Sequence, residues 1–394
     1  MADISRGLVA IALFFLAGAA QAKALGGDKA LVPYVEAEMA ANHVPGMALA
    51  IVKGGRITWS RGFGMADVKR RRPVTPETLF VAASISKTVI AAAAMRAVEE
   101  GRVSLDSDID TMLPFSVRNP ASPDRPITLR TLATHSSGIV DEDQIYNGPL
   151  NYHKGSDNPL SLAEFLRDYL VPDRPHYDRS ANFRPSGTWI YSNIGAALAA
   201  LVVERSTSMS FEAWCQSRLF RPIGMAATGW HQRSVNMAHS AVPYSFVDGQ
   251  VTAYQHYGLA TWPDGGLRTS THDLARFLAM VVNDGKAGRR QVLAKASVRE
   301  MLQPQGVEAV DKVPPHLPLP QAIFWRGVLD KNGKPTLVGH FGSDPGTAGF
   351  IAFDPATKVG AVGLMNMDND DVRAAMLRRI LLRLIQEGQT SGAR

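Results

Sequence analysis

Cysteine and long hydrophobic stretches are scarce in this chain of 394 residues. Cys215 is the only cysteine, so no disulfide can form within the chain and its stability must come from a hydrophobic core. Cys215 lies in an amphipathic helical pattern, where a small buried hydrophobic residue is expected rather than a nucleophile. No apolar stretch after the first 22 residues is long enough for a membrane helix. We therefore expect no stable membrane insertion of the mature protein.

Several sequence motifs of other protein classes are absent. The phosphate-binding patterns G-x-x-x-x-G-K-[ST] and G-x-G-x-x-G do not occur, so no nucleotide or other cofactor is implied. The ten histidines form no H-x-x-x-H pair and only one cysteine is present, so no metal is expected. The G-x-S-x-G nucleophile elbow of α/β-hydrolases is also absent, because Ile190 occupies its first glycine position. The net charge of +6 is spread along the chain, which argues against a nucleic-acid partner.

The N-terminus has the pattern of a secretory signal peptide. Arg6 precedes 13 apolar residues, 8–20, and Ala20-Gln21-Ala22 follows as a cleavage site. Ala22-Lys23-Ala24 is a second cleavage site, so the sequence leaves open which alanine precedes the cut. We expect residues 1–22 to be removed and the mature protein to be periplasmic or secreted.

Patterns of strands lie toward both ends of the chain, and helical patterns dominate the middle. The expected strands are 47–52, 56–63, 324–329, 335–341, 348–353 and 359–365. The expected helices are 29–42, 86–100, 160–170, 194–204, 274–283 and 371–386. This order predicts an α/β (α+β) fold, in which an antiparallel sheet of N- and C-terminal strands is flanked by helices. Residues 23–110 and 270–394 would form this domain and 111–269 an inserted, mainly helical one, with the active site between them.

Ser84 and Lys87 begin the alanine-rich helix and lie one turn apart on one face. A serine hydroxyl needs a proton acceptor to become a nucleophile, and a lysine can serve only if its pKa is lowered by burial and nearby positive charge. The helix N-terminus contributes in two ways. Its partial positive charge disfavours the ammonium form of Lys87, and its free N–H groups can face a developing oxyanion. We expect Lys87 to have a lowered pKa.

A lone S-x-x-K occurs about once by chance in a chain of this composition. Two further patterns occur in a consistent order, Tyr191-Ser192-Asn193 in the helical region and His340-Phe341-Gly342 on an expected strand. Taken alone, the spacing favours a core tyrosine for Tyr191 and a helix N-cap for Asn193. His340 alone reads as a core histidine, and His135 as a structural residue or loop hydrogen-bonder. Together the three patterns are specific.

With these patterns the chain resembles the serine β-lactamase, DD-peptidase and esterase family, which has S-x-x-K, Y-x-N and K/H-x-G motifs. Residues 129–138, 263–267 and 344–346 are similar to further family segments. The resemblance implies that Ser84 is the nucleophile, Lys87 its proton acceptor and Tyr191 the acid/base for the leaving group. It also implies that Asn193 binds the substrate carbonyl. His340 and Gly342 would line the sheet edge, and the N–H groups of Ser84 and Ser343 would form an oxyanion hole.

The third motif favours some members of this family over others. Class C β-lactamases resemble this chain but usually carry lysine at the position of His340, and a largely neutral histidine removes one anchor for an anionic β-lactam. We therefore predict an exported serine hydrolase that cleaves amide or ester bonds of a small or peptide-like acyl substrate. A class C-like β-lactamase and a penicillin-binding or sensing protein with little turnover are the alternatives. Asn332-Gly333 predicts a two-residue hairpin turn, which places Gly339 opposite Arg326, so Arg326 is expected to face away from the site as a surface residue.

Overall fold

The computed structural model describes residues 28–309, 321–329 and 335–390. The signal peptide predicted for residues 1–22 and the turn predicted at Asn332-Gly333 lie outside these ranges. No helix within the described ranges is long and apolar enough to cross a membrane.

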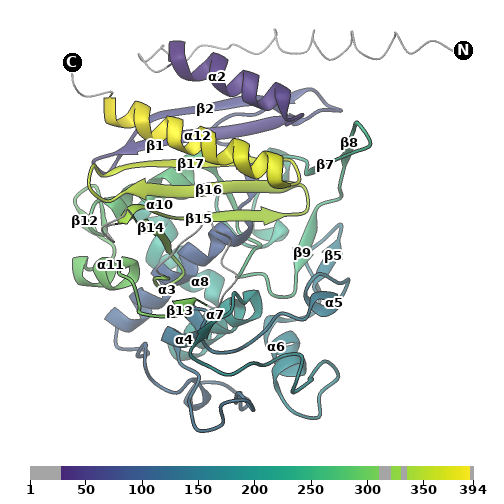
Figure 1. Ribbon diagram of the computed structural model, residues 1–394, viewed down its shortest axis with the longest axis vertical. Coiled ribbons are helices and arrows are strands. Elements are labelled where there is room, and N and C mark those ends of the chain that lie inside the picture. Colours follow the sequence, from purple (N-terminus) through teal and green to yellow (C-terminus); the bar gives the residue numbers. More distant parts are fainter. Residues whose placement is uncertain (1–27, 310–320, 330–334, 391–394) are drawn as a thin grey trace, which may run out of the picture.

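A seven-stranded sheet forms the centre of the fold (Figure 1). Its order is β14-β15-β16-β17-β1-β2-β3, and each neighbouring pair is antiparallel. The strands are β1 (Gly46–Lys53), β2 (Arg56–Asp67), β3 (Arg72–Pro73), β14 (Arg326–Leu329), β15 (Pro335–Asp344), β16 (Thr347–Asp354) and β17 (Val359–Met365). Strands from both ends of the chain therefore share one sheet, which confirms the predicted fold class.

Helices cover both faces of this sheet, and β1 shows how its sequence allows this. Met47 and alternate residues of β1 pack in a core with α2 (Asp28–Ala41) and α12 (Asp371–Thr390). Ala48 and its alternates pack in a second core on the opposite face, which α10 (Thr271–Val282) covers. Successive side chains of a strand point to opposite faces, so a strand buried on both faces is apolar throughout.

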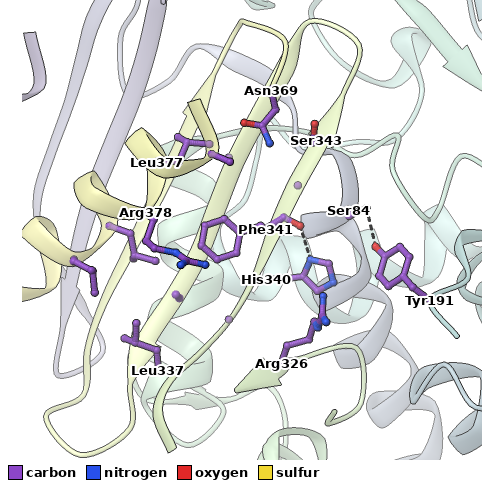
Figure 2. Close-up of a pocket in the computed structure, with 17 residues that line it drawn as sticks. Ser84, Tyr191, Arg326, Leu337, His340, Phe341, Ser343, Asn369, Leu377 and Arg378 are labelled. Atoms are coloured by element: carbon purple, nitrogen blue, oxygen red, sulfur yellow. Dashed lines mark hydrogen bonds between the residues drawn. The ribbon is translucent and has the colours of Figure 1, made fainter. Parts of the chain in front are cut away.

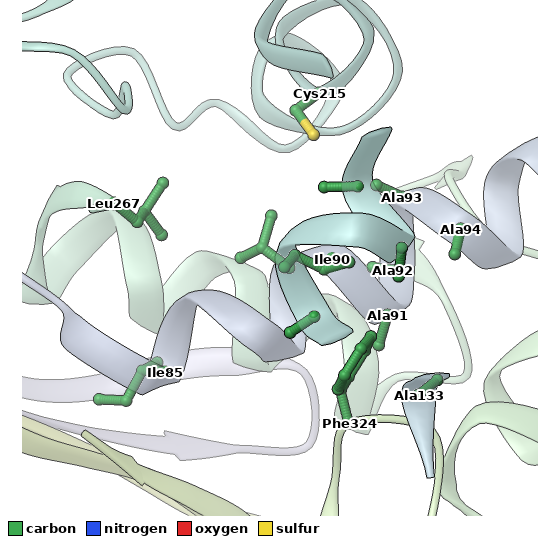
Figure 3. Close-up of a cluster of buried hydrophobic side chains, with 14 of the residues drawn as sticks. Ile85, Ile90, Ala91, Ala92, Ala93, Ala94, Ala133, Cys215, Leu267 and Phe324 are labelled. Atoms are coloured by element: carbon green, nitrogen blue, oxygen red, sulfur yellow. The ribbon is translucent and has the colours of Figure 1, made fainter. Parts of the chain in front are cut away.

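Helix α3 (Ser86–Glu99) packs between helices of the central region. It contacts α7 (Asn193–Thr207) and α11 (Lys295–Leu302), and its alanines allow close approach. Figure 3 shows α3 alanines in one cluster with Cys215 and Phe324. Cys215 is fully buried, which confirms its interpretation as a core residue. The division into domains at residues 110/111 and 269/270 stays a prediction.

The remaining elements are short and connect the sheet with the central helices. The further helices are α4 (Leu129–Ala133), α5 (Asp143–Tyr146), α6 (Leu162–Leu170), α8 (Phe211–Cys215) and α9 (Arg221–Ile223). The short 3₁₀ turns are η1 (Ala83–Ile85), η2 (Ile109–Thr111), η4 (Gln232–Ser234) and η5 (Met237–His239), and η3 (Gln216–Phe220) is a π-helical segment. The smaller strands are β4 (Leu79–Val81), β5 (Tyr152–Lys154), β6 (Thr188–Trp189), β7 (Tyr244–Val247), β8 (Gln250–Ala253), β9 (Tyr257–Leu259), β10 (Arg268–Ser270), β11 (Lys286–Ala287), β12 (Arg290–Gln291) and β13 (Glu308–Ala309).

Element boundaries differ from the expected ones where local backbone chemistry decides them. α6 starts at Leu162 because the Ser161 side chain accepts a hydrogen bond from the Glu164 N–H, so Ser161 is the N-cap. β14 starts at Arg326 because Phe324 has a φ of +51°, which is incompatible with an extended strand.

Candidate active site

Ser84 lies in the 3₁₀ turn η1, directly before α3. Ala83 has a φ of +47°, a left-handed conformation that costs about 1 kcal/mol or more in a residue with a side chain. The Ser86 hydroxyl donates a hydrogen bond of 2.6 Å to the Ala83 carbonyl, and Ile85 is fully buried. The surroundings therefore hold a strained turn in place, and this turn presents Ser84 to the site.

The Lys87 side chain is fully buried beneath Ser84. Its Nζ donates to Ser84 Oγ at 3.0 Å, to Asn193 Oδ1 at 2.7 Å and to the backbone oxygen of Asp264 at 3.0 Å. A carboxylate oxygen of Asp264 lies 3.8 Å from the same nitrogen. An ammonium group has three N–H donors, and here each of them has an acceptor.

The pKa of Lys87 is shifted in the direction opposite to the one expected from the sequence. Burial lowers the pKa of Lys87, but the Tyr191 oxygen and the carboxylates of Asp264 and Asp141 outweigh burial, and the net pKa is raised above its usual value. The expectation of a lowered pKa is therefore wrong. That expectation rested on the helix N-terminus alone, whereas the acidic groups that raise the pKa come from loops far away in the sequence.

Tyr191 and Asn193 reach Ser84 and Lys87 from the start of α7. The Tyr191 hydroxyl lies 2.9 Å from Ser84 Oγ. Ser192 is the N-cap of α7, since its hydroxyl accepts from the Gly195 N–H. Asn193 is the first helical residue, so its reading as an N-cap is wrong, and its side-chain oxygen accepts from Lys87 instead.

Asp141 and His135 hold the backbone of residues 192–194, which follow Tyr191, in place. Asp141 accepts hydrogen bonds from the N–H groups of Asn193 and Ile194, at 2.7 and 3.0 Å. The buried His135 accepts from the Ser192 N–H through Nδ1, and its ring lies 4.5 Å from the Tyr191 ring. Burial, together with the charge of Lys87, lowers the pKa of His135 well below its usual value. His135 is therefore a neutral loop hydrogen-bonder, as predicted.

Gly342 lets β15 lie against the Ser84 turn. A Cβ at this position would come within 2.4 Å of the Ala82 carbonyl oxygen. Any other residue would push the strand away from η1, so the glycine of the third motif has a steric cause. Ser343, the next residue, lines the same cavity as Ser84. The pairing of their N–H groups in an oxyanion hole stays a prediction.

His340 faces the site but carries no charge. It is buried, and burial together with the charges of Lys87 and Arg326 lowers its pKa to about 3. Its Nδ1 lies 2.6 Å from the Phe341 carbonyl, so this nitrogen carries the ring proton. His340 is therefore a neutral residue at neutral pH, as the sequence indicated.

Arg326 pairs with Gly339 in the expected register, and the register shift lies farther along, between Val328 and Leu329. The expectation that Arg326 faces away is nevertheless wrong. Arg326 is half-buried, lines the cavity that contains Ser84, and its guanidinium carbon lies 4.9 Å from the centre of the Trp189 ring. Figure 2 shows it reaching toward His340. Arg326 begins a short edge strand, so its long side chain can bend around the sheet edge.

Two acid–tyrosine pairs border the site and were not singled out as functional from the sequence. The Tyr146 hydroxyl donates to the Asp264 carboxylate at 2.5 Å, and the Tyr152 hydroxyl donates to Asp344. Burial raises the pKa of Asp264 to about 6 and that of Asp344 to about 7. Both aspartates lie in segments that resemble the family, 263–267 and 344–346. This resemblance is the one sequence feature that points to them. Their proximity to Ser84 and Lys87 depends on the tertiary fold.

Two cavities meet at Ser84. One of about 570 Å³ is lined by Ser84, Tyr191, Arg326 and His340 and continues along β15 toward α12 (Figure 2). Another of about 310 Å³ is lined by Ser84, Asn193, Ser343 and Asp344. A substrate can therefore place its reacting carbonyl at Ser84, with one part on either side.

A serine hydroxyl contacted by a buried lysine and a tyrosine, on a sheet of this topology, is the arrangement of the penicillin-recognising class of proteins. The sequence profile described as Beta-lactamase matches residues 31–385. The chain therefore belongs to the beta-lactamase family, which confirms the family predicted from its motifs.

Individual relatives agree with this family. The protein flp of Staphylococcus aureus strain MRSA252 is 23% identical over 343 residues, which are 86% of this chain and 62% of that protein. The chain thus spans less than two thirds of that relative's length. The octameric penicillin-binding protein homologue from Pyrococcus abyssi has a TM-score of 0.75 and 26% identity, covering 91% of this chain and 78% of its own. The class C beta lactamase from Rhodobacter sphaeroides has a TM-score of 0.67 and 22% identity, covering 91% and 99%.

Proposed function

We propose that the protein is an exported serine hydrolase that cleaves an amide or ester bond through an acyl-enzyme on Ser84. The observation that carries the proposal is the contact of Ser84 Oγ with both the Lys87 Nζ, at 3.0 Å, and the Tyr191 hydroxyl, at 2.9 Å. A hydroxyl held between a cation and a proton-transfer group at the mouth of a cavity is positioned for nucleophilic attack.

Tyr191 is the proton relay in this proposal. As Ser84 Oγ attacks the substrate carbonyl, its proton passes to the Tyr191 oxygen, and the proton of Tyr191 passes to the leaving group. Lys87 remains an ammonium ion, in agreement with its raised pKa, and its positive charge offsets negative charge that develops on the nearby oxygens. Water then gives a proton to the Tyr191 oxygen and attacks the acyl carbon. The bond from this carbon to Ser84 Oγ breaks, Tyr191 passes its proton to Ser84 Oγ, and the acid is released.

The N–H groups of Ser84 and Ser343 are the proposed oxyanion hole. The close approach of Gly342 to the Ala82 carbonyl supports this, because it brings β15 against the Ser84 turn. One backbone donor to an oxyanion typically contributes about 3 to 4 kcal/mol of transition-state stabilisation.

Arg326 favours substrates with a negative charge next to the cleaved bond. His340 is neutral, so Arg326 supplies positive charge on this side of Ser84, from the same cavity. A planar guanidinium can hold a carboxylate with two parallel hydrogen bonds. A peptide-like substrate with a C-terminal carboxylate, as in a DD-peptidase reaction, fits this arrangement.

Three substrates distinguish the alternatives. The purified mature protein and its Ser84→Ala variant are incubated separately with a fluorescent penicillin, p-nitrophenyl acetate and nitrocefin. We expect Ser84-dependent turnover of the ester. A long-lived penicillin label without ester turnover would identify a binding or sensing protein instead, and rapid nitrocefin hydrolysis would identify a β-lactamase. Equal ester turnover by Ser84→Ala would contradict the proposal.

A further inference from the structure

An apolar groove extends from the Ser84 cavity along the face of β15 that is turned toward α12 (Figure 2). Leu337, Gly339 and Phe341 are alternate residues of β15 and therefore share this face. Opposite them, α12 contributes Ala374, Leu377, Leu381 and Leu382 to the same cavity, and Arg378 of this helix also lines it, with its side chain beside Phe341 (Figure 2). The groove is thus continuous with the space in front of the nucleophile.

The groove exists because α12 leaves the outermost long strand uncovered. α12 packs chiefly on β17, β1 and β16. On β15, Gly339 contributes no side chain to this face, and Ala352, its partner on β16, contributes only a methyl group. The strand face beside α12 is therefore hollow where a side chain would otherwise fill it.

The exposed side chains of the groove point to an apolar ligand. Phe341 is 41% exposed and Leu382 51% exposed, and within the described ranges only seven large hydrophobic residues are at least 40% exposed. Two of these seven thus line the cavity of the nucleophile. Exposed apolar side chains that gather at a cavity mark a binding site, because burying them against an apolar group is favourable.

The groove lies on the leaving-group side of Ser84. Asn193, to which the family resemblance assigns the carbonyl of the acyl part, lines the cavity of about 310 Å³ and not the larger one. Arg326 and His340 line the other cavity, of about 570 Å³, and the groove is part of it. The acyl part and the leaving group of a substrate at Ser84 would therefore enter different cavities.

We propose that this groove binds an apolar group of the substrate's leaving portion, so that preferred substrates release an alcohol or amine with a hydrocarbon chain or apolar ring. The inference rests on the proposed function and specifies its substrate class. In acylation the bond between the carbonyl carbon and the leaving oxygen or nitrogen breaks, the proton relayed by Tyr191 goes to that atom, and the apolar group leaves with it.

Ethyl, butyl and octyl acetate test this groove. All three give the same acetyl-enzyme, so differences in kcat/KM arise only in binding and acylation. One buried methylene raises kcat/KM by up to about fourfold, so we expect octyl acetate to exceed ethyl acetate by at least about tenfold. The ratio is measured within one protein sample, which makes it independent of the folded fraction. A ratio within twofold of one would overturn the inference.

Two groove variants and one control complete the test. Leu382→Asp places a charge in the groove and Ala374→Trp fills it, and each should lower the octyl-to-ethyl ratio at least about threefold. Val372 is 64% exposed on the same helix and lies outside the cavity, so Val372→Asp should keep the wild-type ratio. Equal loss in Val372→Asp, or no loss in both groove variants, would overturn the assignment.

The outcomes separate the groove from the proposed function. Ser84-dependent turnover of ethyl acetate with a flat chain-length series would overturn only the groove. Turnover of none of the esters, or equal turnover by Ser84→Ala, would overturn the proposed function together with the groove.

Discussion

Lys87 and Asp264 form a buried pair beneath the candidate nucleophile: the lysine Nζ lies 3.0 Å from the backbone oxygen and 3.8 Å from a carboxylate oxygen of Asp264. Both side chains are fully buried. Opposite charges at this distance stabilise each other strongly where water is excluded. The pair therefore keeps Lys87 charged, and the positive charge stays next to Ser84.

Asp264→Asn should move the basic limb of the pH–rate profile. The Asp264 carboxylate is one of the charges that raise the pKa of Lys87, so its removal lowers this pKa. If the ammonium form is active, the basic limb of kcat/KM for p-nitrophenyl acetate shifts to lower pH by about one unit or more.

A control carboxylate separates this effect from a general loss of charge. The Asp284 side chain is 41% exposed and lies near the surface residues Lys295 and Lys358, so Asp284→Asn should leave the limb in place. An unshifted basic limb in Asp264→Asn, or a shift of the acidic limb instead, would show that charged Lys87 is not the active form.

Asp344→Asn should change how stability depends on pH. Burial raises the pKa of Asp344 from 3.8 to about 7, so between these values the folded protein holds a proton that the unfolded chain releases. This group therefore lowers stability as the pH rises through that window, and asparagine does not titrate.

The difference in melting temperature, Asp344→Asn minus wild type, should thus be a few degrees larger at pH 8 than at pH 4. Thermal melts of both proteins across this range measure the difference. A constant difference would mean that Asp344 does not hold its proton in the folded state.

Arg326→Gln should lower kcat/KM for substrates that carry a carboxylate next to the cleaved bond. Hydrogen bonds to a charged group contribute about 1.5 to 3 kcal/mol, which corresponds to a loss of about 10- to 150-fold. The measured quantity is the kcat/KM for a peptide with a free C-terminus divided by that for its C-terminal amide. Arg326→Lys keeps the charge but not the planar fork, so it should fall between wild type and Arg326→Gln. An unchanged ratio in Arg326→Gln would remove this residue from substrate recognition.

The full chain, expressed in a Gram-negative bacterium, should appear in the periplasm with a shortened N-terminus. N-terminal sequencing should find Lys23 as the first residue after cleavage behind Ala22, or Leu25 if Ala24 precedes the cut. An uncleaved chain in the cytoplasmic fraction would contradict the export proposal.

The sequence predicts those parts of the site that depend on local order along the chain. Ser84 and Lys87 lie one helical turn apart, and this spacing brings them together in the structure, where they lie 3.0 Å apart. The predicted register, with Arg326 opposite Gly339, is also the one observed. Period-two and helical patterns likewise identify the strands and helices that form the central sheet and its covering layers.

Long-range proximity explains what the sequence does not predict. Asp264 is 177 residues from Lys87 along the chain, and nothing in its local pattern shows that it lies beneath the lysine. The sign of the Lys87 pKa shift was missed for this reason. Arg326 shows another limit, since strand alternation fixes the direction of Cβ but not where a long side chain at a sheet edge ends.

The central claim is that Ser84 forms the acyl-enzyme, and mass spectrometry after reaction with a β-lactam tests it most directly. Wild-type protein and Ser84→Ala are incubated with a fluorescent penicillin, quenched in acid and digested, and the labelled peptide is sequenced. We expect one adduct, on the peptide that contains Ser84, and none in Ser84→Ala, whose melting temperature should stay close to wild type. A label on another residue, or equal labelling of Ser84→Ala, would contradict the account.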